Sequence, residues 1–216
     1  MKITALTCTF ERPQAFALCQ QYVARQTRQP DQWLILDGPE PMREKVLKAI
    51  RSGAIEGDAV VFFEDDDFVA AGWLAWCEKH LARHDIVGQG HALYYHVRQR
   101  WMSNCRNTRH ASLCQTAMRS HLLPQLALLI EAFDNNFFDT RLWRLNARRY
   151  LHIPKDGERL VVGIKGMPGK LGYSHEHANM IPKDVTIDPS LFHLWQHIGA
   201  DALNYSSFYD QPRMAE

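Results

Sequence analysis

The most constraining feature of this sequence is an apolar run that leads directly into four carboxylates. Residues 59–63 read AVVFF, and residues 64–67 read EDDD. A strand with no polar position is typical of the centre of a parallel sheet that is covered on both faces. The sequence therefore predicts an α/β fold in which this strand is buried and its carboxylates lie at the end of the strand.

The first 85 residues alternate between strand-like and helix-like patterns. Residues 3–9 and 33–36 are apolar and β-branched, as expected for strands. Apolar residues at helical spacing follow each of these runs and follow the acidic run as well. These residues are Phe16, Cys19, Tyr22 and Val23, then Met42, Val46, Leu47 and Ile50, and then Trp73, Leu74, Trp76, Cys77 and Leu81. Repeated strand and helix units predict a mostly parallel, doubly wound sheet flanked by helices.

The pattern is less regular beyond residue 85. We predict strands at 93–97 and 160–164, helices at 121–132 and 139–149, and a glycine-marked loop at 163–172. No internal repeat or linker divides the chain. A length of 216 residues suits one α/β core, so residues 1–216 are expected to form a single domain.

Apolar length and cysteine spacing indicate where the protein resides. No apolar run approaches the roughly 20 residues that cross a bilayer, and the N-terminus lacks a signal-peptide pattern. The five cysteines are scattered and form no pair with metal-binding or redox spacing, which predicts reduced thiols. We expect a soluble cytoplasmic protein without a membrane attachment.

The charge is unevenly distributed along the chain. The formal net charge is only +1, but residues 79–170 hold 15 Lys or Arg against 6 Asp or Glu. This surplus predicts that the middle of the chain faces an anionic partner.

The acidic run itself points to a cation. Adjacent carboxylates repel and raise one another's pKa. One pair of unit charges at 4 Å contributes roughly 4 kcal/mol at an effective dielectric near 20, so a divalent cation would offset the repulsion. Oxygen ligands favour Mg²⁺ or Mn²⁺, and open α/β sheets bind ligands beyond the carboxyl ends of their strands. The alternative is a solvated acidic loop that precedes the helix after Gly72.

Three segments together resemble the nucleotide-sugar-binding half of GT-A glycosyltransferases, especially the family 2 group. The segments read TCTFERP, LILDG and VVFFEDDDFVAAGWL. Thr9 to Pro13 matches the family's opening nucleotide loop, Asp37 its base- or ribose-binding acid, and Asp65 with Asp67 its Asp-any-Asp motif. LDGPEP departs from the family, which often carries a second acid and a serine there.

The resemblance implies a Rossmann-like GT-A fold and transfer of a hexose from a nucleotide-sugar, with a UDP-sugar as the first candidate. Residues 1–85 would bind the donor, and residues 86–216 would bind the acceptor and carry out catalysis. Mn²⁺ or Mg²⁺ held by Asp67, with Asp65 acting directly or through the ribose, would neutralise the departing diphosphate. Arg12 would position the nucleoside, and Asp66 would belong to the donor-binding set.

The same family commonly supplies a late histidine as a metal ligand and a second-half acid as the base. His175 and His177 alternate in a glycine-flanked segment, and either is a candidate ligand. Asp139 is the preferred base, with Asp134 as the other candidate, because both lie among apolar and aromatic residues. The competing interpretation is that Asn136 or Asp139 caps a helix.

The acceptor is suggested by a segment that mixes arginines with aromatics. Its members are Arg98, Arg100, Arg106 and Arg109, interleaved with Tyr94, Tyr95 and Trp101. Such residues suit a nucleic-acid backbone and stacking on an exposed base, but equally the donor's diphosphate. The compact chain resembles small viral-type transferases that glycosylate hydroxymethylated pyrimidines in DNA, which would work in the host cytoplasm. Lys165 and Lys170 would then help to expose the base.

Three other functions remain open. A glycosyltransferase of this type can instead use a glycan, lipid or protein acceptor. A Mg²⁺-dependent nucleotidyltransferase also uses an α/β sheet and carboxylates, although that class has a glycine-rich loop where this chain reads TFERP. The third is a non-catalytic module that binds a nucleotide-sugar or a metal.

Overall fold

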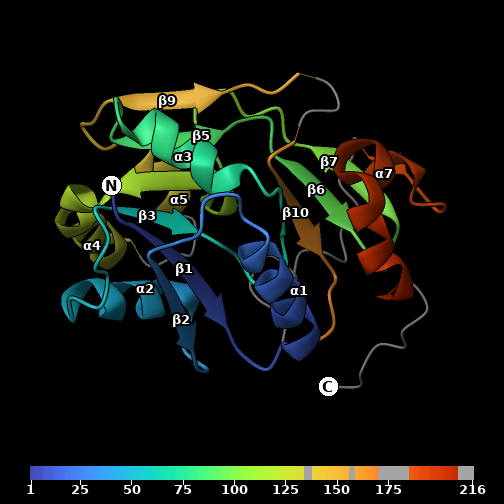
Figure 1. Cartoon of the computed structure of the whole chain (residues 1–216), viewed down its shortest axis with the longest axis horizontal. Helices are drawn as coiled ribbons and strands as arrows, with labels where there is room; N and C mark the ends of the chain where they lie inside the picture. Colours follow the sequence, from blue (N-terminus) through green and yellow to red (C-terminus); the bar gives the residue numbers. More distant parts are fainter. Residues whose placement is uncertain (134–137, 156–158, 170–184, 209–216) are drawn as a thin grey trace.

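The computed structural model describes residues 1–133, 138–155, 159–169 and 185–208. It contains a six-stranded sheet with helices on its faces and a five-stranded sheet beside it (Figure 1). The larger sheet has the order β2-β1-β3-β8-β5-β9. Its strands are β1 (Ile3–Thr9), β2 (Gln32–Asp37), β3 (Ala59–Phe62), β5 (Ile86–Gln89), β8 (Thr116–Arg119) and β9 (Arg149–His152).

The second sheet has the order β11-β7-β6-β10-β4. Its strands are β4 (Phe68–Val69), β6 (Leu93–His96), β7 (Trp101–Asn104), β10 (Val161–Lys165) and β11 (Thr186–Ile187). The helices are α1 (Pro13–Ala24), α2 (Met42–Arg51), α3 (Trp73–Leu81), α4 (Leu123–Ala132), α5 (Phe138–Leu142) and α7 (Phe192–Ile198). Short 3-10 segments are η1 (Leu113–Gln115), η2 (Ser120–Leu122) and η4 (Gly199–Phe208). Within these described ranges, none of the helices has the length and apolarity needed to cross a bilayer.

The apolar strand β3 serves two cores, which explains why it has no polar position. Val61 joins the core that α1 and α3 form on one face of the larger sheet. Val60 and Phe62 join the core that α2, α4 and α5 form on the other face. Since successive side chains of a strand point to opposite faces, both faces of β3 must be apolar.

The larger sheet is mostly parallel, as expected from the sequence, but not purely so: three of the five pairs among its described strands are parallel and two are antiparallel. β1 pairs in parallel with β2 and β3, as expected for repeated strand and helix units. β8, however, lies antiparallel between β3 and β5. No crossover helix connects β5 to β8; the chain instead forms β6 and β7 and returns through η1. A parallel pair usually requires a crossover helix, and the path from β5 through β6, β7 and η1 provides none.

The helix predicted at 139–149 is wrong in its second half. α5 ends at Leu142, and residues 149–152 form β9, which pairs in parallel with β5. Two contacts draw the chain towards the sheet. The indole Nε1 of Trp143 donates to Thr116 Oγ1 at 3.0 Å, and the amide of Arg148 donates to Asp85 Oδ2 at 2.9 Å.

The buried amide of Gln26 joins α1 to the start of α3. Its Nε2 donates to the carbonyls of Tyr22 and Ala70 at 3.0 and 2.9 Å, and its Oε1 accepts from the amide of Leu74 at 3.0 Å. We predict that Gln26→Leu lowers the free energy of unfolding by about 3 kcal/mol, because buried backbone groups lose their partners. Urea unfolding measures this loss. The exposed Gln21→Leu within α1 should change it by less than about 0.5 kcal/mol, and equal losses would contradict the assignment.

Candidate active site

The carboxyl ends of β1, β2 and β3 place the acidic run at the same edge of the sheet as Thr9 and Asp37. β1 and β2 are in register so that Thr9 pairs with Asp37, and β3 ends beside β1 just before Glu64. The acidic run therefore lies at the edge of the sheet where ligands of open α/β sheets bind. Its three aspartates are only 1 to 3% exposed. A solvated acidic loop is excluded by this burial.

The guanidinium of Arg12 holds two of these carboxylates. Its Nη1 lies 2.6 Å from Asp65 Oδ1, and its Nη2 lies 2.7 Å from Asp66 Oδ2. Arg12 reaches them because it directly precedes α1, which begins at Pro13. Burial lowers the pKa of Arg12, but the two carboxylates outweigh it and raise the pKa above its usual value. Arg12, the residue expected to position a nucleoside, therefore contacts the acidic run in this structure.

Asp67 is held from the opposite side by the end of β10. Its Oδ1 accepts a hydrogen bond of 2.7 Å from the amide of Ile164. The next residue, Lys165, is 9% exposed and packs over the ring of Tyr94 at 5.3 Å. Burial lowers the pKa of Lys165, but Asp67, Asp66 and Glu64 together raise it. No carboxylate oxygen of a described residue lies within 4.0 Å of its Nζ, so this ammonium faces the acidic run without forming a close ion pair.

The sequence interpretation placed Lys165 in a glycine-marked loop and missed its position beside the acidic run. The available signal was a lysine at the end of the apolar run VVGI. A charged residue in that place belongs to the same strand-end geometry as the acidic run.

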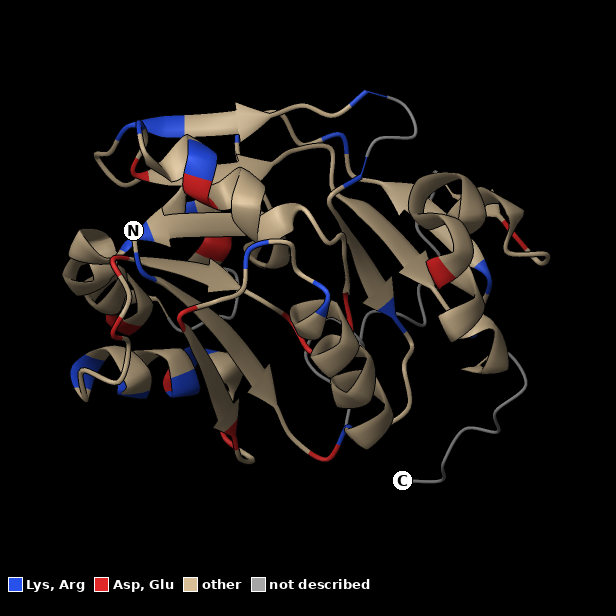
Figure 2. Cartoon of the chain, viewed as in Figure 1, with Lys and Arg blue, Asp and Glu red and all other residues tan. Residues whose placement is uncertain are grey.

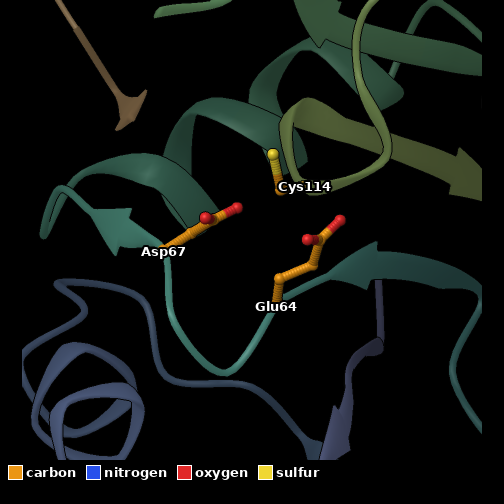
Figure 3. Close-up of side chains that lie close together, drawn as sticks. All are labelled: Glu64, Asp67 and Cys114. Carbon is orange, nitrogen blue, oxygen red and sulfur yellow. The ribbon is translucent and has the colours of Figure 1, made fainter. Parts of the chain in front are cut away.

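The acidic run keeps oxygen atoms that suit a cation. The Oδ2 atoms of Asp65 and Asp67 are buried and have no hydrogen-bond partner among the described residues. Ligand atoms of Glu64, Asp67 and Cys114 lie within 4.8 Å of one another (Figure 3). Buried polar atoms are normally satisfied, so unpartnered carboxylate oxygens in a cluster fit a bound metal ion.

The pKa values of the acidic run show how costly these charges are without a cation. Burial raises the pKa of Glu64 to about 8, and the charge of Asp67 raises it further while Lys165 lowers it. Burial also raises the pKa of Asp65 to about 7 and that of Asp67 to about 6. A divalent cation favours the ionised forms and would therefore oppose these shifts.

Of the residues proposed as the base or as late metal ligands, the structure describes only Asp139. The Oδ1 of Asp139 accepts from the amide of Thr140 at 2.8 Å, and both residues lie within α5. Burial raises the pKa of Asp139, whereas backbone amides, including that of Leu113, lower it in part. Asp139 therefore lies beside η1, which carries Cys114. Asp134, Asn136, His175 and His177 lie outside the described residues.

The segment of arginines and aromatics is partly buried, which corrects its interpretation as an exposed binding surface. Tyr95, Arg100 and Trp101 are 0, 5 and 4% exposed, so they cannot stack on a base or contact a phosphate at the surface. One Nη of Arg100 donates to the carbonyl of Ser206 at 2.9 Å. Figure 2 shows basic residues on several elements, including α2, α3 and β9, rather than gathered on this segment.

We predict that the Arg12 contact stabilises the fold. Arg12→Met should lower the free energy of unfolding by about 3 kcal/mol, since it leaves buried carboxylates without their cation. The double variant Arg12→Met with Asp65→Asn should recover part of this loss. Urea unfolding without added metal checks both, with the exposed Arg83→Met expected to change stability by less than about 0.5 kcal/mol. A loss no larger than that of Arg83→Met would contradict the contact's role.

Comparison with known proteins shows the fold. No protein-family model matches the chain, and no curated protein matches it in sequence. S. aureus TarS 1–349 matches with a TM-score of 0.53 and 13% identity over 76% of this chain and 60% of that one. A longer TarS structure matches with a TM-score of 0.52 and 13% identity over 76% of this chain and 37% of that one. A197 from STIV matches with a TM-score of 0.46 and 13% identity over 71% of this chain and 82% of that one. The chain thus spans less than two thirds of either TarS structure. The likeness to TarS shows that this chain has a Rossmann-like GT-A fold, here with a mixed central sheet.

Proposed function

We propose that this protein is a metal-dependent glycosyltransferase that moves a sugar from a nucleotide-sugar, first of all a UDP-sugar, to an acceptor hydroxyl. The observation that carries the proposal is the buried acidic run with unpartnered oxygens on Asp65 and Asp67, at the carboxyl ends of β1 to β3. TarS, which shares the fold, has been solved with UDP and with UDP-GlcNAc. We carry this donor class over to the present chain.

The nucleoside would bind next to the acidic run. Asp37 is exposed at the end of β2, and its register partner in β1 is Thr9. Asp37 also lines a groove of about 450 Å³ together with Lys45 and Lys48 of α2. Small-molecule sites fall in this range of volume. We assign Asp37 to a ribose or base contact for this reason.

Each charged group would have a defined task during transfer. The bound cation would supply positive charge to the departing diphosphate. Asp67, with Asp65 or Glu64, would hold that cation, while Arg12 keeps the acidic run in place. The ammonium of Lys165 would add a second, fixed positive charge for the diphosphate.

Transfer also requires a base near the acceptor. The acceptor oxygen forms a bond to the anomeric carbon, the bond from that carbon to the phosphate oxygen breaks, and the base takes the hydroxyl proton. We assign this role to Asp139, whose pKa is raised by burial and which lies beside η1. A general base works best when its pKa lies near the working pH, so a raised pKa makes this carboxylate a more effective base at neutral pH.

For the acceptor we propose hydroxymethylated pyrimidine in DNA. The basic surplus of residues 79–170 supports it, and Arg106 and Arg109 of that stretch are exposed. Glycan, lipid or protein acceptors are the other outcomes of an acceptor screen.

We predict that Mn²⁺ and one UDP-sugar together raise the melting temperature of the wild type and give slow donor hydrolysis. Asp67→Asn should lower the hydrolysis rate about 100-fold, because the charge that holds the cation is lost. The exposed Asp58→Asn serves as the matched control and should keep the wild-type rate. Absence of any response to a donor panel would overturn the glycosyltransferase proposal. Release of pyrophosphate from a nucleoside triphosphate would instead support nucleotidyl transfer.

We also predict that Asp139→Asn separates binding from chemistry. Transfer to the acceptor found in the screen should fall about 100-fold or more, since the base is lost. The affinity for the UDP-sugar, measured by calorimetry, should stay within about twofold of the wild type, because a base acts on the acceptor and not on the donor. Normal transfer by the variant would assign Asp139 to helix capping alone.

A further inference from the structure

The thiol of Cys114 lies within the cluster that is best suited to a cation. Cys114 belongs to η1 and is 3% exposed. Its Sγ lies within 4.8 Å of carboxylate oxygens of both Glu64 and Asp67. Figure 3 shows the three side chains close together, with the carboxylates of Glu64 and Asp67 on either side of the position of Cys114.

We propose that Cys114 is a ligand of the cation that Glu64 and Asp67 hold, and that the site therefore prefers thiophilic divalent ions such as Zn²⁺ and Cd²⁺ over Mg²⁺. Thiolate is a soft ligand, whereas Mg²⁺ demands hard oxygen ligands. The inference rests on the proposed function only in that it concerns the same cation.

An unpartnered oxygen of Asp67 points to a ligand within this cluster. Asp67 is 1% exposed, and its Oδ1 accepts from the amide of Ile164. The Cys114 thiol is close enough to this carboxylate to lower its pKa through a hydrogen bond, while Oδ2 has no partner of ordinary hydrogen-bond geometry among the described residues. The hydrogen bond to Oδ1 fixes the carboxylate, as outer-sphere partners of metal ligands do, and leaves Oδ2 for coordination.

Charge balance supports the same conclusion. Glu64 and Asp67 carry two negative charges when ionised, and the cation that faces both of them from the described residues is Lys165. Its Nζ is farther than 4.0 Å from their oxygens, so it does not occupy the coordinating positions. A divalent ion between these ligands would supply the missing positive charge.

The surroundings of Cys114 differ from those of an ordinary core thiol. Cys77, which is also fully buried, belongs to the apolar core, and burial raises its pKa. Cys114 instead has two carboxylates as near neighbours, where a thiol gains little as apolar filling. On coordination the thiol releases its proton to solvent as the bond from sulfur to the metal forms.

Cadmium titration of the full chain, without nucleotide, tests the proposal. The wild type should bind one Cd²⁺ with the ultraviolet charge-transfer band of a cadmium–thiolate bond. Cys114→Ser should lose the band and at least about tenfold in Cd²⁺ affinity, while its Mg²⁺ affinity changes by less than about twofold. Cys105→Ser removes an exposed thiol and should retain the wild-type band and affinity.

Equal bands and equal Cd²⁺ affinity in the wild type and Cys114→Ser would overturn the proposal. Cadmium NMR of the wild type reports sulfur coordination directly, so an oxygen-only chemical shift would also overturn it even if Cys114→Ser fails to fold. The two proposals can fail separately. If Asp67→Asn abolishes Mn²⁺ binding and donor hydrolysis, the glycosyltransferase proposal stands. If Cys114→Ser at the same time changes neither Cd²⁺ nor Mg²⁺ affinity, the proposal of a thiolate ligand is wrong.

Discussion

The burial of neighbouring carboxylates at the end of β3 is the constraint on which the rest of the structure depends. Ionised groups lose several kcal/mol of hydration when buried, and opposite charges must offset this loss. The fold brings Arg12 from the start of α1 and Lys165 from the end of β10 to the same acidic run. Two distant segments thus supply positive charge at one strand end, where the unpartnered oxygens remain for a cation.

The N-terminal half of the fold is readable from the sequence because its elements are long and periodic. β1 and α1 to α3 follow the predicted order, and the two cores on β3 explain its apolar run. The second half is less readable. β5 and β8 have four residues each, and their antiparallel pairing depends on the path of the chain through the second sheet. The residues that follow α5 likewise form β9 because β5 offers a pairing edge, which local helical spacing does not reveal.

The sequence likewise predicts one part of the candidate site and not the other. Thr9 and Asp37 end β1 and β2, and the acidic run begins just after β3, so their meeting at one edge follows from the predicted sheet. Arg12 contacts Asp65 across 53 residues, and Ile164 contacts Asp67 across 97. These contacts, like the approach of Cys114, arise only from tertiary packing. The burial of Tyr95 and Trp101 could not be predicted from the sequence either, because a strand of the second sheet and an exposed aromatic segment have similar compositions.

The most direct test of the central claim is the coupling between Mn²⁺ and UDP, measured by calorimetric titration of UDP with and without saturating Mn²⁺. If the acidic run holds a cation that in turn holds the diphosphate, Mn²⁺ should tighten UDP binding by about tenfold or more, and UDP should tighten Mn²⁺ binding by the same factor. The coupling should vanish in Asp67→Asn. UDP affinity that is independent of Mn²⁺ in the wild type, or a coupling that survives in Asp67→Asn, would contradict the account.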